Sequence, residues 1–182
     1  QNQGAILHRY VLGVYDFLER LHKRYPNILI EDCSGGGGRF DAGMLYYTPQ
    51  IWCSDNTDAI ERIKIQYGTS FAYPSCTVGS HVSAVPNHQT GRTTELAARA
   101  AVAMAGSFGY ELDLNLLTEE EKEQVRKQIE NYHRFEMLIR QGRYYRLTDV
   151  WKKREYAAWE YCRPDGSEAL VTVVTLDTQC NP

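Results

Sequence analysis

Several patterns that would identify a function class are missing from this chain of 182 residues. Its five cysteines include no CxxC pair, so the sequence supports neither a zinc knuckle nor a thioredoxin-like site. An odd and scattered set favours free thiols in a reducing compartment, and on this ground alone we expect a cytoplasmic protein. The cysteines are Cys33, Cys53, Cys76, Cys162 and Cys180.

Long apolar runs and a strong charge excess are also lacking. No run approaches the length of a membrane span, and no signal peptide is visible. A net charge of −3 gives no general reason to expect nucleic acid or a membrane surface as a partner. The chain opens within a helical pattern and without a Met, so we expect Gln1 to be a cut end.

Hydrophobic spacing predicts four helices. Apolar residues recur every three or four positions in the first, which Pro26 ends. Thr57 is expected to cap the second, and a capping box of Thr118 and Glu121 opens the last, which Gly142 ends. The helices are predicted over residues 4–25, 58–69, 94–105 and 118–142.

Short strands are predicted between these helices. Strand–helix alternation implies a parallel sheet, either doubly wound or part of a (β/α)8 barrel. Near Thr148 the pattern changes to two strands around the turn at Pro164, which predicts an antiparallel β-domain. The parallel strands are predicted over residues 28–33, 49–53, 72–82 and 107–114, and the antiparallel ones over 157–161 and 169–176.

Four consecutive glycines follow the first predicted strand, in SGGGGRFD, residues 34–41. A phosphate loop would need GxxxxGK[ST], but no Lys-Ser or Lys-Thr follows, and GxGxxG fails at Phe40. Two interpretations remain: a tight surface loop, or a close approach of the backbone to a neutral polyol.

Asp55 ends the second strand segment, just after Trp52. Partial burial against an aromatic ring raises a carboxyl pKa, which makes Asp55 a candidate general acid. Asp55 could instead be a helix cap or a loop stabiliser, and Trp52 could fill the core. His81 and His88 are interpreted as loop hydrogen bonders, and no metal site is predicted because a third convergent ligand is missing.

Four long strings narrow these alternatives: ILIEDCSGGGGRFD, MLYYTPQIWCSDNTDAIERIKIQYGTS, HVSAVPNHQTGR and FGYELDL. In this order they resemble the α-galactosidases of glycoside hydrolase family 36, the melibiase type. The resemblance implies an α/β fold in which residues 1–147 form the second half of a (β/α)8 TIM barrel. Residues 148–182 would begin a C-terminal antiparallel β-sandwich domain.

The same resemblance assigns roles to residues. Asp55 becomes the acid/base of a retaining double displacement. The residues that contact galactose become Cys33, Ser34, Gly35 and Gly36. Trp52 is a further candidate for substrate binding, with core packing as its alternative. The family's nucleophile lies in a Lys-Trp-Asp motif, which this sequence lacks, so we expect the nucleophile upstream of Gln1 and the present chain to be inactive alone. Half of a barrel leaves strand edges uncovered, so we also expect residues 1–182 alone to be insoluble or loosely packed.

The implied substrate is a terminal α-galactoside of the melibiose or raffinose type, with no cofactor. The resemblance also places Cys33 near the galactose 2-hydroxyl, where a 2-acetamido group would collide, and it suggests a homotetramer. The alternatives are an α-N-acetylgalactosaminidase, a raffinose-synthase-like galactosyltransferase, or a non-catalytic carbohydrate-binding fragment.

Overall fold

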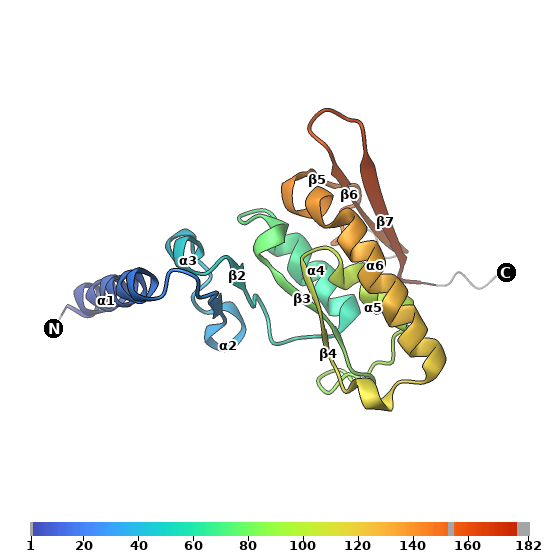
Figure 1. Ribbon diagram of the computed structural model, residues 1–182, viewed down its shortest axis with the longest axis horizontal. Helices are drawn as coiled ribbons and strands as arrows, with labels where there is room; N and C mark the ends of the chain where they lie inside the picture. Colours follow the sequence, from blue (N-terminus) through green and yellow to red (C-terminus); the bar gives the residue numbers. More distant parts are fainter. Residues whose placement is uncertain (1, 153–154, 178–182) are drawn as a thin grey trace.

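The computed structural model describes residues 2–152 and 155–177, and Cys180 lies outside them. The molecule is elongated: helix α1 (Gln3–Arg24) lies at one end, and a larger body of helices and sheets lies at the other (Figure 1). In the part of the chain that the structure describes, no helix is both long and apolar enough to cross a bilayer. Four of the cysteines are free thiols: Cys33, Cys53, Cys76 and Cys162.

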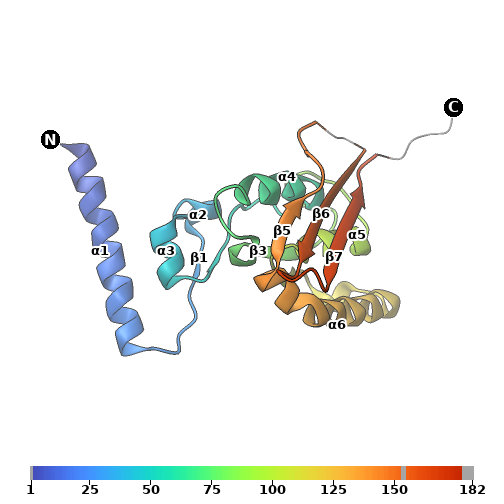
Figure 2. The same cartoon turned by 90° about the horizontal axis from the view of Figure 1, so that it is seen from above.

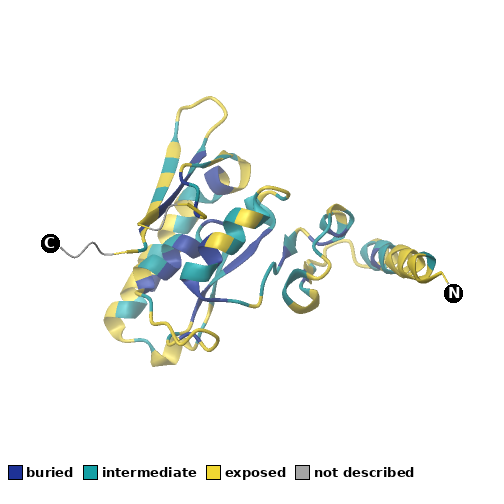
Figure 3. Ribbon diagram, turned by 180° about the vertical axis from the view of Figure 1, so that it is seen from behind, coloured by how far each residue is buried: buried dark blue, intermediate teal, exposed yellow. Residues whose placement is uncertain are grey.

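Helix α1 confirms the first predicted helix. Asn2 caps it by accepting a hydrogen bond from the Ala5 amide, and the helix ends two residues before Pro26. Its buried residue is Leu18, which packs with Met44 and Ile51. The outer side of α1 remains exposed (Figure 3). Several large apolar side chains of α1 are more than half exposed: Ile6, Leu7, Tyr10 and Phe17.

Four short parallel strands lie side by side in chain order. They are β1 (Glu31–Asp32), β2 (Gln50–Ile51), β3 (Gly79–Ser83) and β4 (Ser107–Glu111). β1 pairs with β2 and β3 with β4, and a single bridge between Ile51 and Val78 joins the two pairs.

The predicted parallel strands were too long. A 3-10 turn, η1 (Ser75–Thr77), occupies the start of the third predicted strand. In the first, Leu29 is 87% exposed, because its run finds no paired strand among the described residues.

Three helices follow the strands as predicted: α4 (Ala59–Thr69), α5 (Leu96–Ala103) and α6 (Glu119–Gln141). The capping box of α6 is confirmed. The predicted cap of α4 is wrong. Asp58, not Thr57, caps this helix, because its carboxylate accepts hydrogen bonds from the amides of Ile60 and Glu61.

The glycine segment is not the plain loop that was predicted. Residues Ser34–Gly37 make a single tight turn, α2, and Ala42–Tyr47 form a short helix, α3, that the sequence did not indicate. Asp41 caps α3 by accepting hydrogen bonds from the Met44 amide and the Tyr15 hydroxyl, both at 2.8 Å. These contacts fasten the glycine segment to α1.

A three-stranded antiparallel sheet follows α6 and packs against the helices (Figure 2). It consists of β5 (Arg143–Arg146), β6 (Tyr156–Cys162) and β7 (Ala169–Thr175), of which β5 was not predicted. Tyr161 is buried at the contact, where its hydroxyl lies 2.7 Å from the Ala105 carbonyl and 2.8 Å from the Ser75 hydroxyl. Burial raises the pKa of Tyr161, so the hydroxyl stays protonated.

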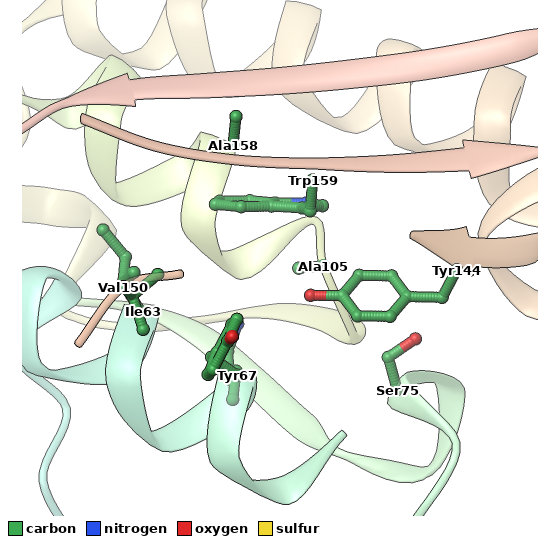
Figure 4. A pocket seen from close by; sticks show the side chains of 9 residues that line it. Ile63, Tyr67, Ser75, Ala105, Tyr144, Val150, Ala158 and Trp159 are labelled. Atoms are coloured by element: carbon green, nitrogen blue, oxygen red, sulfur yellow. The ribbon is translucent and has the colours of Figure 1, made fainter. Parts of the chain in front are cut away.

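A small cavity of about 20 Å³ lies between α4 and the antiparallel sheet, lined by Tyr67, Tyr144 and Trp159 among others (Figure 4). The Tyr144 hydroxyl points into the space between the other two rings. This volume admits about one water molecule, so the cavity is too small to hold a sugar.

Candidate active site

The ends of β1 and β2 meet, because the two strands are parallel and paired. Asp32 is level with Ile51, and the Trp52 amide donates to the Asp32 carbonyl at 2.8 Å. The segments that follow each strand, the glycine turn and the residues up to Asp55, therefore lie next to each other.

The glycine turn has an unusual backbone. Ser34, Gly35, Gly36 and Gly37 all have positive φ, between 50° and 92°. Side chains disfavour this left-handed region, which is the reason for consecutive glycines here. At its far end, the Phe40 ring stacks on Tyr73 with the centroids 4.1 Å apart, and this contact holds the turn in place.

Two of the glycines contact the Asp55 segment directly. A Cβ placed on Gly36 would lie 3.1 Å from the Asp55 nitrogen, and one on Gly37 would lie 3.0 Å from the Cys53 carbonyl oxygen. A Cβ on Gly35, in contrast, would meet nothing within 4 Å. Because Gly36 and Gly37 carry no side chains, the turn can approach the Asp55 segment closely. The space beside Gly35 stays open.

Asp55 itself is exposed, and the structure does not make it a helix cap. The turn around it is ordered by its neighbours: the Asn56 amide donates to the Ser54 hydroxyl, and the Asp58 amide donates to the Asn56 side chain. Asp55 is therefore a carboxyl group on a rigid turn that faces solvent.

The segment after a third strand, β3, contacts the residues just after Asp55. The segment after β3 contains Asn87, which is buried and donates to the Thr57 hydroxyl at 3.0 Å. Thr90 donates to the Asp58 carboxylate at 2.6 Å, and Arg92 forms an ion pair with that same buried carboxylate. These contacts tie the loop to the first turn of α4, just after Asp55.

Burial alone would raise the pKa of Asp58. The hydrogen bond from Thr90, the Glu61 amide and Arg92 outweigh that effect, so the pKa lies below its usual range. Asp58 is therefore charged at neutral pH. Asn87 and Gln89 are thus hydrogen-bonding residues of this loop, and the Gln89 side chain accepts a hydrogen bond from the Thr57 amide.

His81 does not lie in a loop, as the sequence suggested, but within β3. Its ring is 4.8 Å from that of Trp52, and its Nδ1 is 3.9 Å from a Glu111 carboxylate oxygen. On the neighbouring strands, the Gln50 amide donates to Glu31 at 2.6 Å. The side chains of Glu31, Gln50, His81 and Glu111 thus form a polar row across the sheet. This row lies on the face opposite to Ile51 and Val82, which pack against helices.

Burial lowers the pKa of His81, although Glu111 and Glu31 oppose the shift. His81 is therefore neutral at physiological pH. Within the described residues, no three His, Cys, Asp or Glu side chains gather closely enough to hold a metal ion.

Two more buried charged residues, besides Asp58, lie beside the ends of β1 and β2 and escaped the sequence analysis. Arg62 on α4 is 3% exposed and reaches both the Ser54 and the Gly79 carbonyls. Asp32 is 7% exposed, and burial raises its pKa. Both contacts of Arg62 depend on folding, so the pattern of the sequence held no signal for them.

The chain belongs to the Melibiase family, which matches residues 1–142. Its curated relatives are α-galactosidases, and its structural neighbours are α-galactosidases of glycoside hydrolase family 36. The helices and sheets described above therefore superpose on part of a galactosidase domain of this family.

Two bacterial relatives illustrate the similarity. The chain is 60% identical over 178 residues to the bifunctional alpha-galactosidase/sucrose kinase AgaSK of Mediterraneibacter gnavus, covering 98% of this chain and 19% of that protein. It is 51% identical over 181 residues to alpha-galactosidase AgaA of Geobacillus stearothermophilus, covering 100% of this chain and 25% of that protein. The chain thus spans a quarter or less of their length.

Solved structures of α-galactosidases are similar to this chain over most of its length. The galactosidase domain of AgaSK superposes with a TM-score of 0.93 at 60% identity, over 96% of this chain and 24% of that one. An AgaA variant in complex with raffinose gives a TM-score of 0.88 at 53% identity, over 91% of this chain and 23% of that one.

Proposed function

We propose that this chain works as part of a longer enzyme, a retaining α-galactosidase that hydrolyses terminal α-galactosides such as melibiose and raffinose. The observation that carries the proposal is the contact between the glycine turn and Asp55, in a chain 60% identical to a protein named as an alpha-galactosidase. A carboxyl group beside an open backbone turn suits a glycosidic oxygen held next to sugar hydroxyls.

Residues 1–147 would supply the second half of a (β/α)8 barrel. The order β1 to β4, all parallel and followed by helices, supports this assignment. The row of polar side chains would face the barrel interior. Residues 148–182 would begin a β-sandwich domain; the antiparallel sheet starts earlier, at Arg143, so the division at 147 remains a prediction.

Asp55 would act first as the acid. A carboxylate supplied by the part of the enzyme before Gln1 attacks the anomeric carbon, while Asp55 gives its proton to the glycosidic oxygen. The carbon–oxygen bond breaks, the leaving group departs as a neutral alcohol, and galactose remains as an ester on the nucleophile. In retaining enzymes the two carboxyl groups are about 5 Å apart.

Asp55 would then act as the base. Its carboxylate takes a proton from a water molecule, whose oxygen attacks the anomeric carbon and displaces the nucleophile. This second inversion restores the α configuration of the product. Because the present chain carries one of the two carboxyl groups, we expect residues 1–182 alone to show no turnover.

The sugar would lie against Cys33, Ser34, Gly35, Gly36 and Trp52. The open space at Gly35 supports this position, since a hydroxyl group could approach the backbone there. A raffinose-synthase-like transferase would use the same groups with a sugar hydroxyl in place of water. Product analysis separates the two, because hydrolysis releases free galactose. The tetramer and the cytoplasmic location remain predictions.

The test uses Asp55→Asn in the full-length enzyme. We expect kcat/KM on melibiose, a poor leaving group, to fall by about 10²- to 10⁴-fold. On a dinitrophenyl α-galactoside, whose leaving group needs no proton, kcat/KM should stay close to that of the wild type. Near-normal values on both substrates would refute the assignment.

A further inference from the structure

Arg62 is a buried guanidinium that connects three elements. From α4 its Nη1 donates to the Ser54 carbonyl at 3.2 Å, beyond the end of β2. Its Nη2 donates to the Gly79 carbonyl at 2.5 Å, at the start of β3. Its Nε donates to the Gln66 side chain at 3.1 Å, and its central carbon lies 5.0 Å from the centre of the Trp52 ring.

Among residues 2–152 and 155–177 no carboxylate forms a salt bridge with this charge, and Glu111 acts on it from a greater distance. Burial lowers the pKa of Arg62, whereas the Cys53 side chain and Glu111 oppose the shift. A guanidinium stays charged in proteins, so these two groups, the carbonyl dipoles and the Trp52 face together stabilise it. Burying an ion in this way is costly unless all of its hydrogen bonds are made. A role beyond general stability would explain its position.

The two carbonyl contacts of Arg62 show which part of the backbone this side chain holds in place. The Ser54 carbonyl and the Asp55 amide belong to one peptide group, which is planar and rigid. Gly36 packs against the nitrogen of the same group, since a Cβ there would lie 3.1 Å from it. Arg62 thus holds the peptide that aims Asp55, and Gly36 limits its movement.

We propose that Arg62 is a positioning residue for the general acid. It fixes the Ser54–Asp55 peptide to the start of β3 and thereby sets the direction of the Asp55 carboxyl. This inference rests on the proposed function of Asp55. Arginine suits the task because its planar fork spans two carbonyls at once, whereas the single ammonium of lysine keeps the charge but not this geometry.

Arg62→Lys in the full-length enzyme tests the proposal. We compare kcat/KM on melibiose with kcat/KM on a dinitrophenyl α-galactoside. Since kcat/KM covers the steps up to departure of the leaving group, the ratio reports on protonation, and a loss of folded protein cancels out. We expect the ratio to fall about 10- to 100-fold, because a misplaced catalytic group lowers the rate by this order of magnitude.

Arg99→Lys is the matched control. Arg99 lies on α5, is 5% exposed, and donates to two carbonyls, those of Ser83 and Thr94, but not to the Asp55 segment. Its substitution should lower stability while leaving the ratio unchanged. An equal fall of the ratio in both variants would overturn the proposal.

The remaining outcomes are also distinct. If Asp55→Asn lowers the ratio but Arg62→Lys does not, the positioning role is refuted and the proposed function stands. If neither lowers it, the proposed function itself fails. Should Arg62→Lys not fold, Gln66→Met decides: it removes the acceptor of the Arg62 Nε, and the ratio should fall in the same direction.

Discussion

The backbone of Gly36 lies against the amide of Asp55. A Cβ on residue 36 would sit 3.1 Å from that nitrogen and 3.4 Å from the carboxyl carbon. Gly36 has a φ of 77°, so both its conformation and its surroundings favour glycine. The distance between the glycine turn and the Asp55 segment is therefore set by an absent side chain.

Gly36→Ala should consequently displace Asp55. We expect the ratio of kcat/KM on melibiose to kcat/KM on the dinitrophenyl substrate to fall about 10-fold. Gly35→Ala is the control for this ratio, because residue 35 has a similar φ of 67° but does not contact the Asp55 segment. A Cβ there would enter the proposed sugar site and should lower kcat/KM on both substrates alike. Both variants should lose stability, by about 1 kcal/mol. A change of the ratio in Gly35→Ala as large as that in Gly36→Ala would contradict this account.

Asp58→Asn should destabilise the protein in a pH-dependent way. The pKa of Asp58 is lower in the folded state than its usual value, so the carboxylate stabilises the fold above that usual value, about 3.9. The contribution is lost as the pH falls through the folded pKa. We expect a loss of about 2 kcal/mol at pH 7 that shrinks below about pH 4, measured by urea unfolding. A constant loss at both pH values would refute the role of this charge.

Tyr161→Phe should weaken the contact between the antiparallel sheet and the helices. The substitution leaves the buried Ala105 carbonyl without the donor that lies at 2.7 Å, which costs about 1–3 kcal/mol. Tyr156→Phe on the same strand, where the side chain is 41% exposed, should change the free energy of unfolding by less than about 0.5 kcal/mol. Equal effects of the two substitutions on Tm would show that the hydroxyl is unimportant.

The proposed sugar site also predicts substrate choice. If Cys33 lies near the galactose 2-hydroxyl, a 2-acetamido group would collide with it. We expect the full-length enzyme to cleave nitrophenyl α-galactoside about 100-fold faster than nitrophenyl α-N-acetylgalactosaminide. Comparable values of kcat/KM on the two substrates would exclude Cys33 from this position.

The sequence predicted the long helices well, because their signals are local. The capping box at Thr118 and the apolar spacing around Leu18 each act within a few residues. The short strands were harder to delimit. Whether Ile30 or Val78 belongs to a strand depends on a partner some 20 residues away, which local propensity does not reveal.

The sequence also predicted one part of the candidate site and missed another. The glycines and Asp55 stand in unusual strings directly after apolar segments, so the sequence indicated them. Arg62 and the Asp58–Arg92 pair were missed. Their contacts join residues up to 34 positions apart, and only the folded chain brings them together. Thr57 was chosen as the helix cap for a similar reason, since both Thr57 and Asp58 are good caps locally.

The central claim, that Asp55 is the acid/base, is tested most directly by the product that Asp55→Asn forms in azide. Azide needs no base, so it should displace the nucleophile from the galactosyl ester and restore turnover of the dinitrophenyl α-galactoside. Two inversions then give α-galactosyl azide, which NMR identifies by its anomeric proton. β-Galactosyl azide would make Asp55 the nucleophile, and unchanged hydrolysis without azide product would leave it no catalytic role.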